Sequence, residues 1–303
     1  MADEIDEVST DGDDVEHRSG FVTFVGRPNV GKSSLVNAIC GRKISIVSDK
    51  PQTTRHRIMG VLTRRDSQLV FVDTPGLHKP VTALGERVNS TALESVASVD
   101  GAGDNAVDAV ALVLDATQRF GKGDQWVADR IDIERAVVIV NKIDRAAPEQ
   151  ILAMLATASN LNAAAYFPVS ARSEEGLSAL VEHLTVRLPA GPRYFPAEEV
   201  SDLPEERWIA ELVREQLLAV TRDELPYSIA TQVTEWEWPR IRVDIIVERD
   251  SQKGMVIGKG GSVLKRVGER ARAQLPEGVY LELRVKVDKD WQRRPDRVER
   301  LGY

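Results

Sequence analysis

One short segment constrains this chain more than any other, because it matches the phosphate-binding pattern G-x-x-x-x-G-K-[ST]. The pattern is carried by Gly26, Arg27, Pro28, Asn29, Val30, Gly31, Lys32 and Ser33. It follows an apolar run over residues 21–25 and opens a predicted helix over residues 34–39, beginning at Ser34. Glycines let the backbone wrap phosphates with its N–H groups turned inward, and the helix N-terminus adds a positive dipole end. The sequence therefore predicts a strand, a P-loop and a helix that bind a nucleotide.

Specific roles follow from the chemistry of this loop. Lys32 is expected to reach the β- and γ-phosphates, and the Ser33 hydroxyl is expected to bind Mg²⁺. A second segment follows the apolar run over residues 69–72, and it comprises Asp73, Thr74, Pro75, Gly76 and Leu77. A carboxylate at this strand end can hold Mg²⁺ through water, and the Gly76 N–H can sense the γ-phosphate.

Two further segments predict the base. Asn141, Lys142, Ile143 and Asp144 directly follow a buried strand, and Ser170, Ala171 and Arg172 follow the last one. Asp144 offers two acceptors for the N1–H and exocyclic amine of guanine, whereas adenine would leave this carboxylate unpaired. A backbone N–H of the last segment is expected to meet the guanine O6. We therefore expect GTP and GDP, not ATP, as the nucleotides.

The pattern of apolar runs predicts the fold class and the domains. From residue 19 to residue 188, short apolar runs alternate with helical stretches, which favours an α/β domain with a mostly parallel sheet covered by helices on both faces. Residues 1–18 read as a disordered acidic leader, and residues 189–206 as a Pro-rich linker that acts as an extended, semi-rigid spacer. Residues 207–303 are expected to form a smaller α+β domain. Residues 101–105 look like a loop insertion.

The second domain carries a G-x-x-G sequence, Gly258-Lys259-Gly260-Gly261, between two apolar stretches. In a KH domain such a loop clamps the backbone of about four single-stranded nucleotides. The order helix, strand, strand, helix, helix, strand suits the type II KH form. From Arg240 onward the chain has sixteen Lys and Arg against ten Asp and Glu, although its net charge is -7. We expect RNA contacts from Lys253, Ile257, Gly258, Lys259, Gly260, Gly261 and Lys265.

Composition narrows the remaining possibilities. A single cysteine, Cys40, excludes an intramolecular disulfide, and we expect it to be a packing residue. The sequence holds no apolar run of the roughly 18 to 20 residues needed to cross a bilayer, so we expect a cytoplasmic protein. No exposed apolar helix demands a dimer, so we expect a monomer.

Taken together, the nucleotide motifs resemble those of the translation-factor-like P-loop GTPases. That resemblance implies that Thr53 or Thr54, in switch I (residues 50–55), closes on Mg²⁺ and the γ-phosphate; the sequence does not decide between them. Many such GTPases place a water-orienting glutamine where this chain has Leu77, so the catalytic group is unknown. Asn29 resembles the asparagine that holds K⁺ in related GTPases. We therefore expect slow turnover, stimulated by K⁺ or by a partner. His78 and Lys79 are more simply surface residues.

Over almost its whole length the chain is similar to the bacterial Era-type GTPases with a C-terminal KH domain. The likeness rests on GRPNVGKSSLVN, PQTTRHRI, DTPGLHKP, ELPYS, VIGKGG and LELRVKVDKDW. It implies a GTP-dependent switch that binds the 3′ end of 16S rRNA and assists 30S subunit assembly, with ordered switch loops biasing how the KH domain sits. It also implies an association with the inner membrane that is at most peripheral. Trp291, Arg293 and Arg294 either extend the RNA surface or, for Trp291, pack inside.

Three alternatives stay open or are disfavoured by the residues. The second domain could bind protein instead of RNA, which would make the chain a signalling switch. A GTPase acting on tRNA or the large subunit would share the first domain but not residues 224–228 and 256–261. Asn141 and Asp144 disfavour a metabolic kinase.

Overall fold

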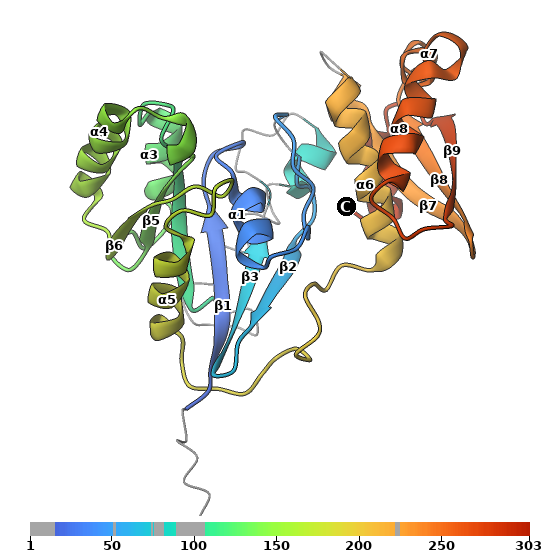
Figure 1. The fold of residues 1–303 in the computed structure, drawn as a ribbon. Helices are drawn as coiled ribbons and strands as arrows, with labels where there is room; N and C mark the ends of the chain where they lie inside the picture. Colours follow the sequence, from blue (N-terminus) through green and yellow to red (C-terminus); the bar gives the residue numbers. More distant parts are fainter. Residues whose placement is uncertain (1–15, 51–52, 74, 76–81, 89–106, 222–224) are drawn as a thin grey trace, which may run out of the picture.

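The computed structural model describes residues 16–50, 53–73, 75, 82–88, 107–221 and 225–303. Within these residues the chain forms two sheets, one of six strands and one of three (Figure 1). The acidic leader up to residue 15, residues 101–105, Thr74, Gly76, Leu77, His78 and Lys79 all lie outside the described residues. The predictions made for them therefore stay predictions.

The six-stranded sheet carries the nucleotide site. Its spatial order is β2-β3-β1-β4-β5-β6, and all neighbours are parallel except the antiparallel pair β2 and β3. The strands are β1 (Arg18–Val25), β2 (Ile58–Thr63), β3 (Ser67–Asp73), β4 (Ala109–Asp115), β5 (Val137–Asn141) and β6 (Ala165–Pro168). This order confirms the mostly parallel α/β fold. The edge strand β2 was not predicted.

Helices cover both faces of this sheet, which explains why its central strands are continuously apolar. On one face α1 (Lys32–Ile39) and α5 (Leu177–Arg187) pack against the sheet through Leu35, Leu180 and Leu184, all fully buried. On the other face α3 (Lys122–Ala128) and α4 (Pro148–Ala158) contribute Val127, Met154 and Ala158. Short 3₁₀ turns follow β5 (Ile143–Arg145) and α4 (Ser159–Leu161).

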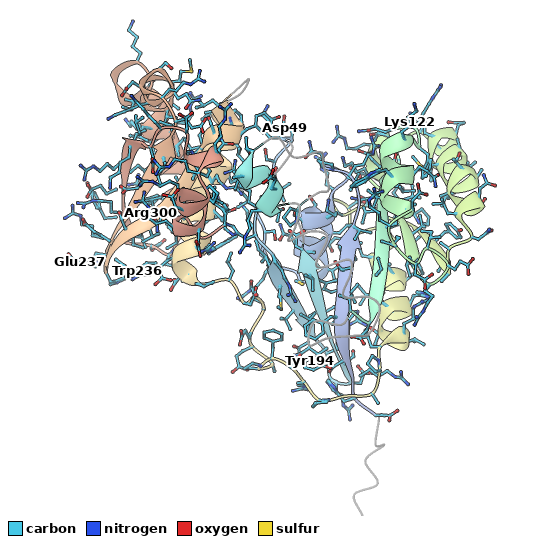
Figure 2. The ribbon with its side chains drawn as sticks, turned by 180° about the vertical axis from the view of Figure 1, so that it is seen from behind. Asp49, Lys122, Tyr194, Trp236, Glu237 and Arg300 are labelled. Carbon is cyan, nitrogen blue, oxygen red and sulfur yellow. The ribbon has the colours of Figure 1, made fainter. Side chains whose placement is uncertain are left out.

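The connection between the domains is fastened to the first sheet. The buried side chain of Gln68 accepts hydrogen bonds from the N–H groups of Tyr194 and Phe195 and donates one to the Phe195 carbonyl oxygen, at 2.8, 3.0 and 2.9 Å. Further on, the Val61 N–H donates to the Val200 carbonyl oxygen at 2.9 Å, which covers the open edge of β2. Tyr194 thus lies at the end of the sheet opposite Asp49 (Figure 2). The connection is extended, as expected, but it is docked along the sheet.

The second domain has the element order predicted for a type II KH domain. Its elements are α6 (Glu205–Val220), β7 (Ala230–Glu237), β8 (Arg240–Val247), α7 (Asp250–Ile257), α8 (Ser262–Arg272), β9 (Tyr280–Val287) and α9 (Pro295–Arg300), with 3₁₀ turns at Leu225–Ser228, Lys259–Gly261 and Trp291–Arg293. Strand β8 pairs antiparallel with β7 and parallel with β9. Helices α6, α7 and α8 pack on one face of this sheet around a core that includes Val213, Val243 and Val267.

Candidate nucleotide site and domain interface

The P-loop lies between β1 and α1, where the sequence predicted it. Gly31 has a φ of 103°, in the left-handed region that glycine favours, and a Cβ added there would lie 2.3 Å from Asn141 Nδ2. Asn141 in turn donates from Nδ2 to the Val30 carbonyl oxygen at 3.0 Å. The amide of the guanine motif therefore fixes the P-loop, and this contact leaves no room for a side chain at residue 31.

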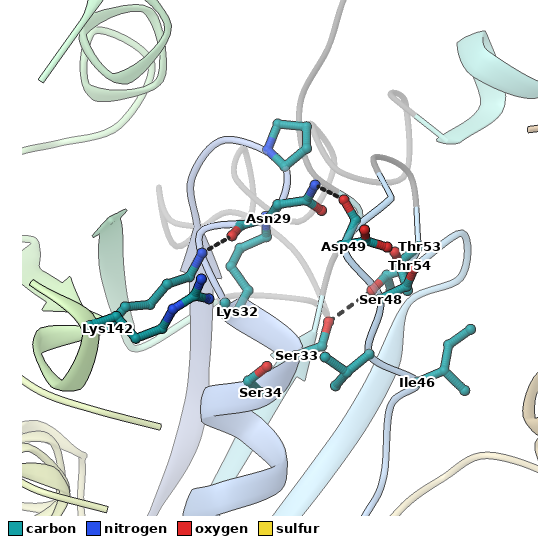
Figure 3. A pocket seen from close by; sticks show the side chains of 14 residues that line it. Asn29, Lys32, Ser33, Ser34, Ile46, Ser48, Asp49, Thr53, Thr54 and Lys142 are labelled. Atoms are coloured by element: carbon teal, nitrogen blue, oxygen red, sulfur yellow. Dashed lines mark hydrogen bonds between the residues drawn. The ribbon is translucent and has the colours of Figure 1, made fainter. Parts of the chain in front are cut away.

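Two adjoining cavities lie above this loop. One, of about 340 Å³, is lined by P-loop residues and by switch I and the residues before it, including Lys32, Ser33, Asp49 and Thr54 (Figure 3). The other, of about 310 Å³, is lined by Gly31, Ser34, Asn141, Lys142, Asp144, Arg145, Ala171 and Arg172. The first has the donors that phosphates need and the second contains the base-recognition segments. Their adjacency matches the two ends of one nucleotide.

Ser33, Thr54 and Asp73 meet at one corner of the phosphate cavity. The Ser33 and Thr54 hydroxyl oxygens lie 2.9 Å apart, and the Thr54 hydroxyl is 3.5 Å from Asp73 Oδ2. Asp73 Oδ1 is buried and has no hydrogen-bond partner in the described part of the chain, and burial raises the pKa of this carboxyl. An orphaned buried carboxylate oxygen beside two hydroxyls is a donor set that suits Mg²⁺.

Thr53 and Thr54 have different surroundings. The Thr53 hydroxyl donates to the Lys50 carbonyl oxygen at 2.6 Å, away from Ser33. Its own carbonyl oxygen accepts a hydrogen bond from Arg214 of α6. Only Thr54 joins the corner formed by Ser33 and Asp73.

Lys32 and Asn29 contact the loop that they belong to or face. Lys32 Nζ donates to the carbonyl oxygens of Gly26 and Arg27 at 3.0 and 3.2 Å, and burial lowers its pKa to about 8 against the opposing effect of Asp73. Asn29 is in the left-handed region with a φ of 64°, and its Nδ2 donates to the Asp49 carbonyl oxygen at 2.6 Å (Figure 3). The Asn29 side chain thus connects the P-loop to the segment before switch I.

Asp144 is oriented by the last motif. The Ser170 hydroxyl, fully buried, donates to Asp144 Oδ1 at 2.8 Å and accepts from the N–H groups of Arg172 and Ser173. The Ala171 N–H lies 3.1 Å from Asn141 Oδ1. The two predicted guanine segments therefore come together as one rigid unit, with the second Asp144 oxygen left for a ligand.

Sequence reasoning missed two residues of this site. Arg145 lines both cavities, and Asp115 receives a hydrogen bond from Lys142 at 2.7 Å. A signal for Asp115 was present, because it directly follows an apolar strand in the same way as Asp73 and Asp144. Cys40 packs against the core beside α1, and burial raises the pKa of its thiol to about 12, as expected of a packing residue.

The G-x-x-G loop joins α7 and α8 on the surface of the second domain. Gly258, Gly260 and Gly261 have φ values of 74°, 59° and 79°, and a Cβ at Gly258 would lie 2.5 Å from Val263 Cγ2. Lys259 is exposed at its tip, and Lys265 is exposed one turn into α8. Lys253 and Ile257 are half-buried on α7. The backbone geometry therefore requires glycine where RNA-clamping loops also require it.

The nucleotide domain contacts the second domain through residues next to the switch segments. Arg55 donates to the carbonyl oxygens of Ile229 and Tyr227 at 2.7 and 2.9 Å. Leu84 and Val88 pack in an apolar cluster with residues of the second domain, including Trp291. Trp291 is fully buried and its Nε1 donates to the Ser228 carbonyl oxygen, so of its two expected roles the structure places it in packing, not on an RNA surface.

Known proteins match both halves of this architecture. A family model described as "50S ribosome-binding GTPase" matches residues 21–142, and one described as a KH domain matches residues 224–292. GTPase Era of Mycobacterium tuberculosis (strain ATCC 25618 / H37Rv) is 46% identical over 306 residues, which cover 95% of this chain and 99% of the relative. The chain belongs to the Era family of GTPases. It is therefore an enzyme that hydrolyses GTP.

Solved structures of the Era family agree with the fold. A crystal structure of Era in complex with MgGDPNP and nucleotides 1506–1542 of 16S ribosomal RNA has a TM-score of 0.87 and 35% identity, covering 95% of this chain and 99% of that one. A variant of Aquifex aeolicus Era bound to GDP and AlF₄⁻ has a TM-score of 0.86 at 35% identity, covering 94% and 99%. Among the described residues of this Era-family chain, no helix is long and apolar enough to span a membrane.

Proposed function

We propose that this Era-family GTPase binds the 3′ end of 16S rRNA through its KH domain and assists assembly of the 30S subunit in a GTP-dependent way. The observation that carries the proposal is the match along nearly the full length to an Era structure that holds both MgGDPNP and that RNA. The exposed, glycine-built loop with Lys259 at its tip supports it from this chain's own residues.

Nucleotide state and RNA binding are coupled through the domain interface in this proposal. Arg214 of α6 donates to the Thr53 carbonyl oxygen, while Thr54 faces the phosphate cavity. A γ-phosphate that draws Thr54 inward would therefore displace the neighbouring peptide that Arg214 holds. Such a movement would change how α6 and the KH domain sit against the GTPase domain.

Mg²⁺ is the metal that we propose for the phosphate cavity. Ser33 and Thr54 would hold it directly and Asp73 would hold it through water. Thr53 is excluded from this proposal because its hydroxyl is engaged by the Lys50 carbonyl oxygen. The bound ion would neutralise charge on the β- and γ-phosphates, and Lys32 would exchange its backbone partners for phosphate oxygens.

K⁺ is proposed as the second cation, held by Asn29. The support is the position of Asn29 between the P-loop and the Asp49 carbonyl oxygen, where carbonyl and amide oxygens can surround a monovalent ion. Slow intrinsic hydrolysis should then be faster in K⁺ than in Na⁺ at equal ionic strength. Equal rates in the two salts would contradict this part of the proposal.

The location follows from the partner. A protein that binds 16S rRNA during subunit assembly acts in the cytoplasm, and any contact with the inner membrane would be peripheral. We propose a monomer as the acting species.

The test is RNA binding measured in three nucleotide states. A labelled oligonucleotide with the sequence of the 16S 3′ end is titrated with the full chain holding a GTP analogue, GDP or no nucleotide, with a shuffled oligonucleotide as control. We expect tighter binding to the real sequence in the GTP-analogue state. Equal, salt-sensitive binding to both oligonucleotides, or no binding, would contradict the RNA proposal and leave the GTPase activity standing.

A loop variant locates the binding to the KH domain. Lys259→Glu should weaken RNA binding at least about tenfold, because it turns a phosphate-binding charge into a repulsive one. Lys122→Glu, at an exposed lysine of the GTPase domain, is the matched control and should not change it. Unchanged binding in Lys259→Glu, or equal losses in both variants, would exclude the G-x-x-G loop as the RNA site.

A further inference from the structure

Asp115 is a buried carboxylate that none of the nucleotide motifs includes. It ends β4 at the same edge of the sheet as the P-loop and is 2% exposed. Its two oxygens have separate partners. Oδ1 accepts from the N–H and the hydroxyl of Thr117 at 2.9 and 2.7 Å, and Oδ2 accepts from Lys142 Nζ at 2.7 Å.

Lys142 connects this carboxylate to the P-loop. Its ammonium also donates to the Asn29 carbonyl oxygen at 2.5 Å (Figure 3). Lys142 and Asn29 both have positive φ values, 66° and 64°, which residues with side chains rarely adopt unless neighbouring contacts hold them. One ammonium thus ties together two strained backbone positions from opposite ends of the nucleotide site.

The position of Lys142 matters because its side chain lines both the phosphate cavity and the base cavity. A lysine side chain is flexible, and holding it in one conformation costs roughly 2 kcal/mol of rotamer entropy. A charged, buried partner offsets that cost. Burial by itself would raise the pKa of Asp115, but hydrogen bonds from Lys142 and Thr117 outweigh it and lower the pKa, so the partner is charged at neutral pH.

We propose that Asp115 is a positioning residue for the guanine nucleotide: by holding the Lys142 ammonium against the Asn29 carbonyl oxygen, it keeps the base-recognition segment and the P-loop in binding register. The base, the ribose and the first phosphates are common to GTP and GDP. Loss of this carboxylate therefore weakens both nucleotides by the same factor. It raises KM and leaves kcat nearly unchanged, because the ground state and the transition state lose the same contact.

The division of labour between the two Asp115 oxygens gives a clean variant. Asp115→Asn keeps an oxygen for the Thr117 turn and places an NH₂ group, a donor, against the Lys142 ammonium. The turn is kept and only the ion pair is lost. Asp108→Asn is the matched control, because Asp108 lies at the opposite end of the same strand and accepts only the Phe21 N–H, at 2.7 Å, among the contacts described.

Calorimetric titration of GDP and of a non-hydrolysable GTP analogue into both variants tests the proposal. A hydrogen bond between charged groups supports an expected rise of about tenfold in both dissociation constants for Asp115→Asn, with KM rising equally and kcat within about twofold. Asp108→Asn should keep wild-type values. A lowered melting temperature with dissociation constants within twofold of wild type would mean a purely structural role and overturn the proposal.

A double-mutant cycle tests whether the effect runs through Lys142. In a Lys142→Met background, which is already weakened, Asp115→Asn should change the GDP dissociation constant less than twofold. An undiminished tenfold effect in that background would overturn the proposal. If Asp115→Asn does not fold, Thr117→Val replaces it: removing the hydroxyl that orients Asp115 should weaken both nucleotides by about threefold, and wild-type affinities would contradict the proposal.

Discussion

The imidazole ring of His56 stacks on the phenol ring of Tyr303, with centroids 4.6 Å apart and planes 12° from parallel. His56 directly follows switch I, whereas Tyr303 belongs to the KH half of the chain. Arg207 donates to the His56 ring at 2.9 Å, and Arg55 lies over the Tyr303 ring with its guanidinium carbon 5.6 Å from the centroid. The two domains therefore meet through a stacked, cation-rich contact beside the nucleotide site.

This contact predicts a pH dependence of stability. Burial, with a smaller contribution from nearby arginines, lowers the pKa of His56 from 6.5 to about 3. Between these values the unfolded chain binds a proton that the folded chain does not, so stability falls as the pH falls below 6.5. At pH 5 the loss from this residue amounts to about 2 kcal/mol. His56→Gln should flatten the acidic fall in the free energy of unfolding measured by urea titration at pH 8 and pH 5. A variant that keeps the full wild-type slope would show that other groups cause it.

Arg55 should be needed for coupling between nucleotide and RNA. Its guanidinium donates to backbone carbonyl oxygens of the KH domain, so Arg55→Met removes these contacts but no residue of the phosphate cavity. Coupling between two sites typically changes affinity by about 5- to 150-fold, and we expect the ratio of RNA affinities with GTP analogue and GDP to fall to about one. GDP affinity should stay near wild type. Arg42→Met, at an exposed arginine of the same domain, is the control; an unchanged ratio in Arg55→Met would exclude this contact from the coupling path.

Asp144→Asn should exchange guanine for xanthine. The Ser170 hydroxyl holds one Asp144 oxygen, so the other accepts from the base. An amide can instead donate to the xanthine O2, where guanine carries its amine. We expect GDP affinity to fall at least about 100-fold and XDP affinity to rise, as measured by competition against a labelled nucleotide. Parallel losses for both nucleotides would mean that the variant damaged the pocket rather than its readout.

Gln68→Leu should release the connection between the domains. The substitution leaves the Tyr194 and Phe195 backbone groups without their side-chain partner, which costs roughly 1 to 3 kcal/mol for each buried group left unsatisfied. We expect a free energy of unfolding lower by at least about 2 kcal/mol and faster protease cleavage near residues 193–195. Gln125→Leu, which removes an exposed contact to Asp129, should change neither. Protection of the linker in Gln68→Leu would show that the strand-edge contacts suffice.

Much of the site could be predicted from local sequence because its chemistry is local. The P-loop glycines, Lys32 and Ser33 are close in sequence, and each later motif directly follows an apolar strand. Parallel strands bring their carboxyl ends to one edge, so separate motifs had to converge there. The same rule covers Asp115, but its role depends on Lys142, 27 residues away in sequence, and on the Asn29 carbonyl oxygen.

What local sequence could not decide is set by long-range contacts. Strand β2 is an edge strand, and its second neighbour is the linker near Ser201, about 140 residues further along. Thr53 and Thr54 are equivalent in sequence, and they are distinguished only because Arg214 holds one peptide while Ser33 and Asp73 surround the other side chain. Trp291 could face RNA or the core until its packing against Leu84 and Val88 was known. The sequence by itself determined the nucleotide, the fold class and the family, because short motifs on parallel strands specify them. The tertiary structure decided which threonine faces the metal corner and how the two domains touch, because those choices depend on side chains far apart in the chain.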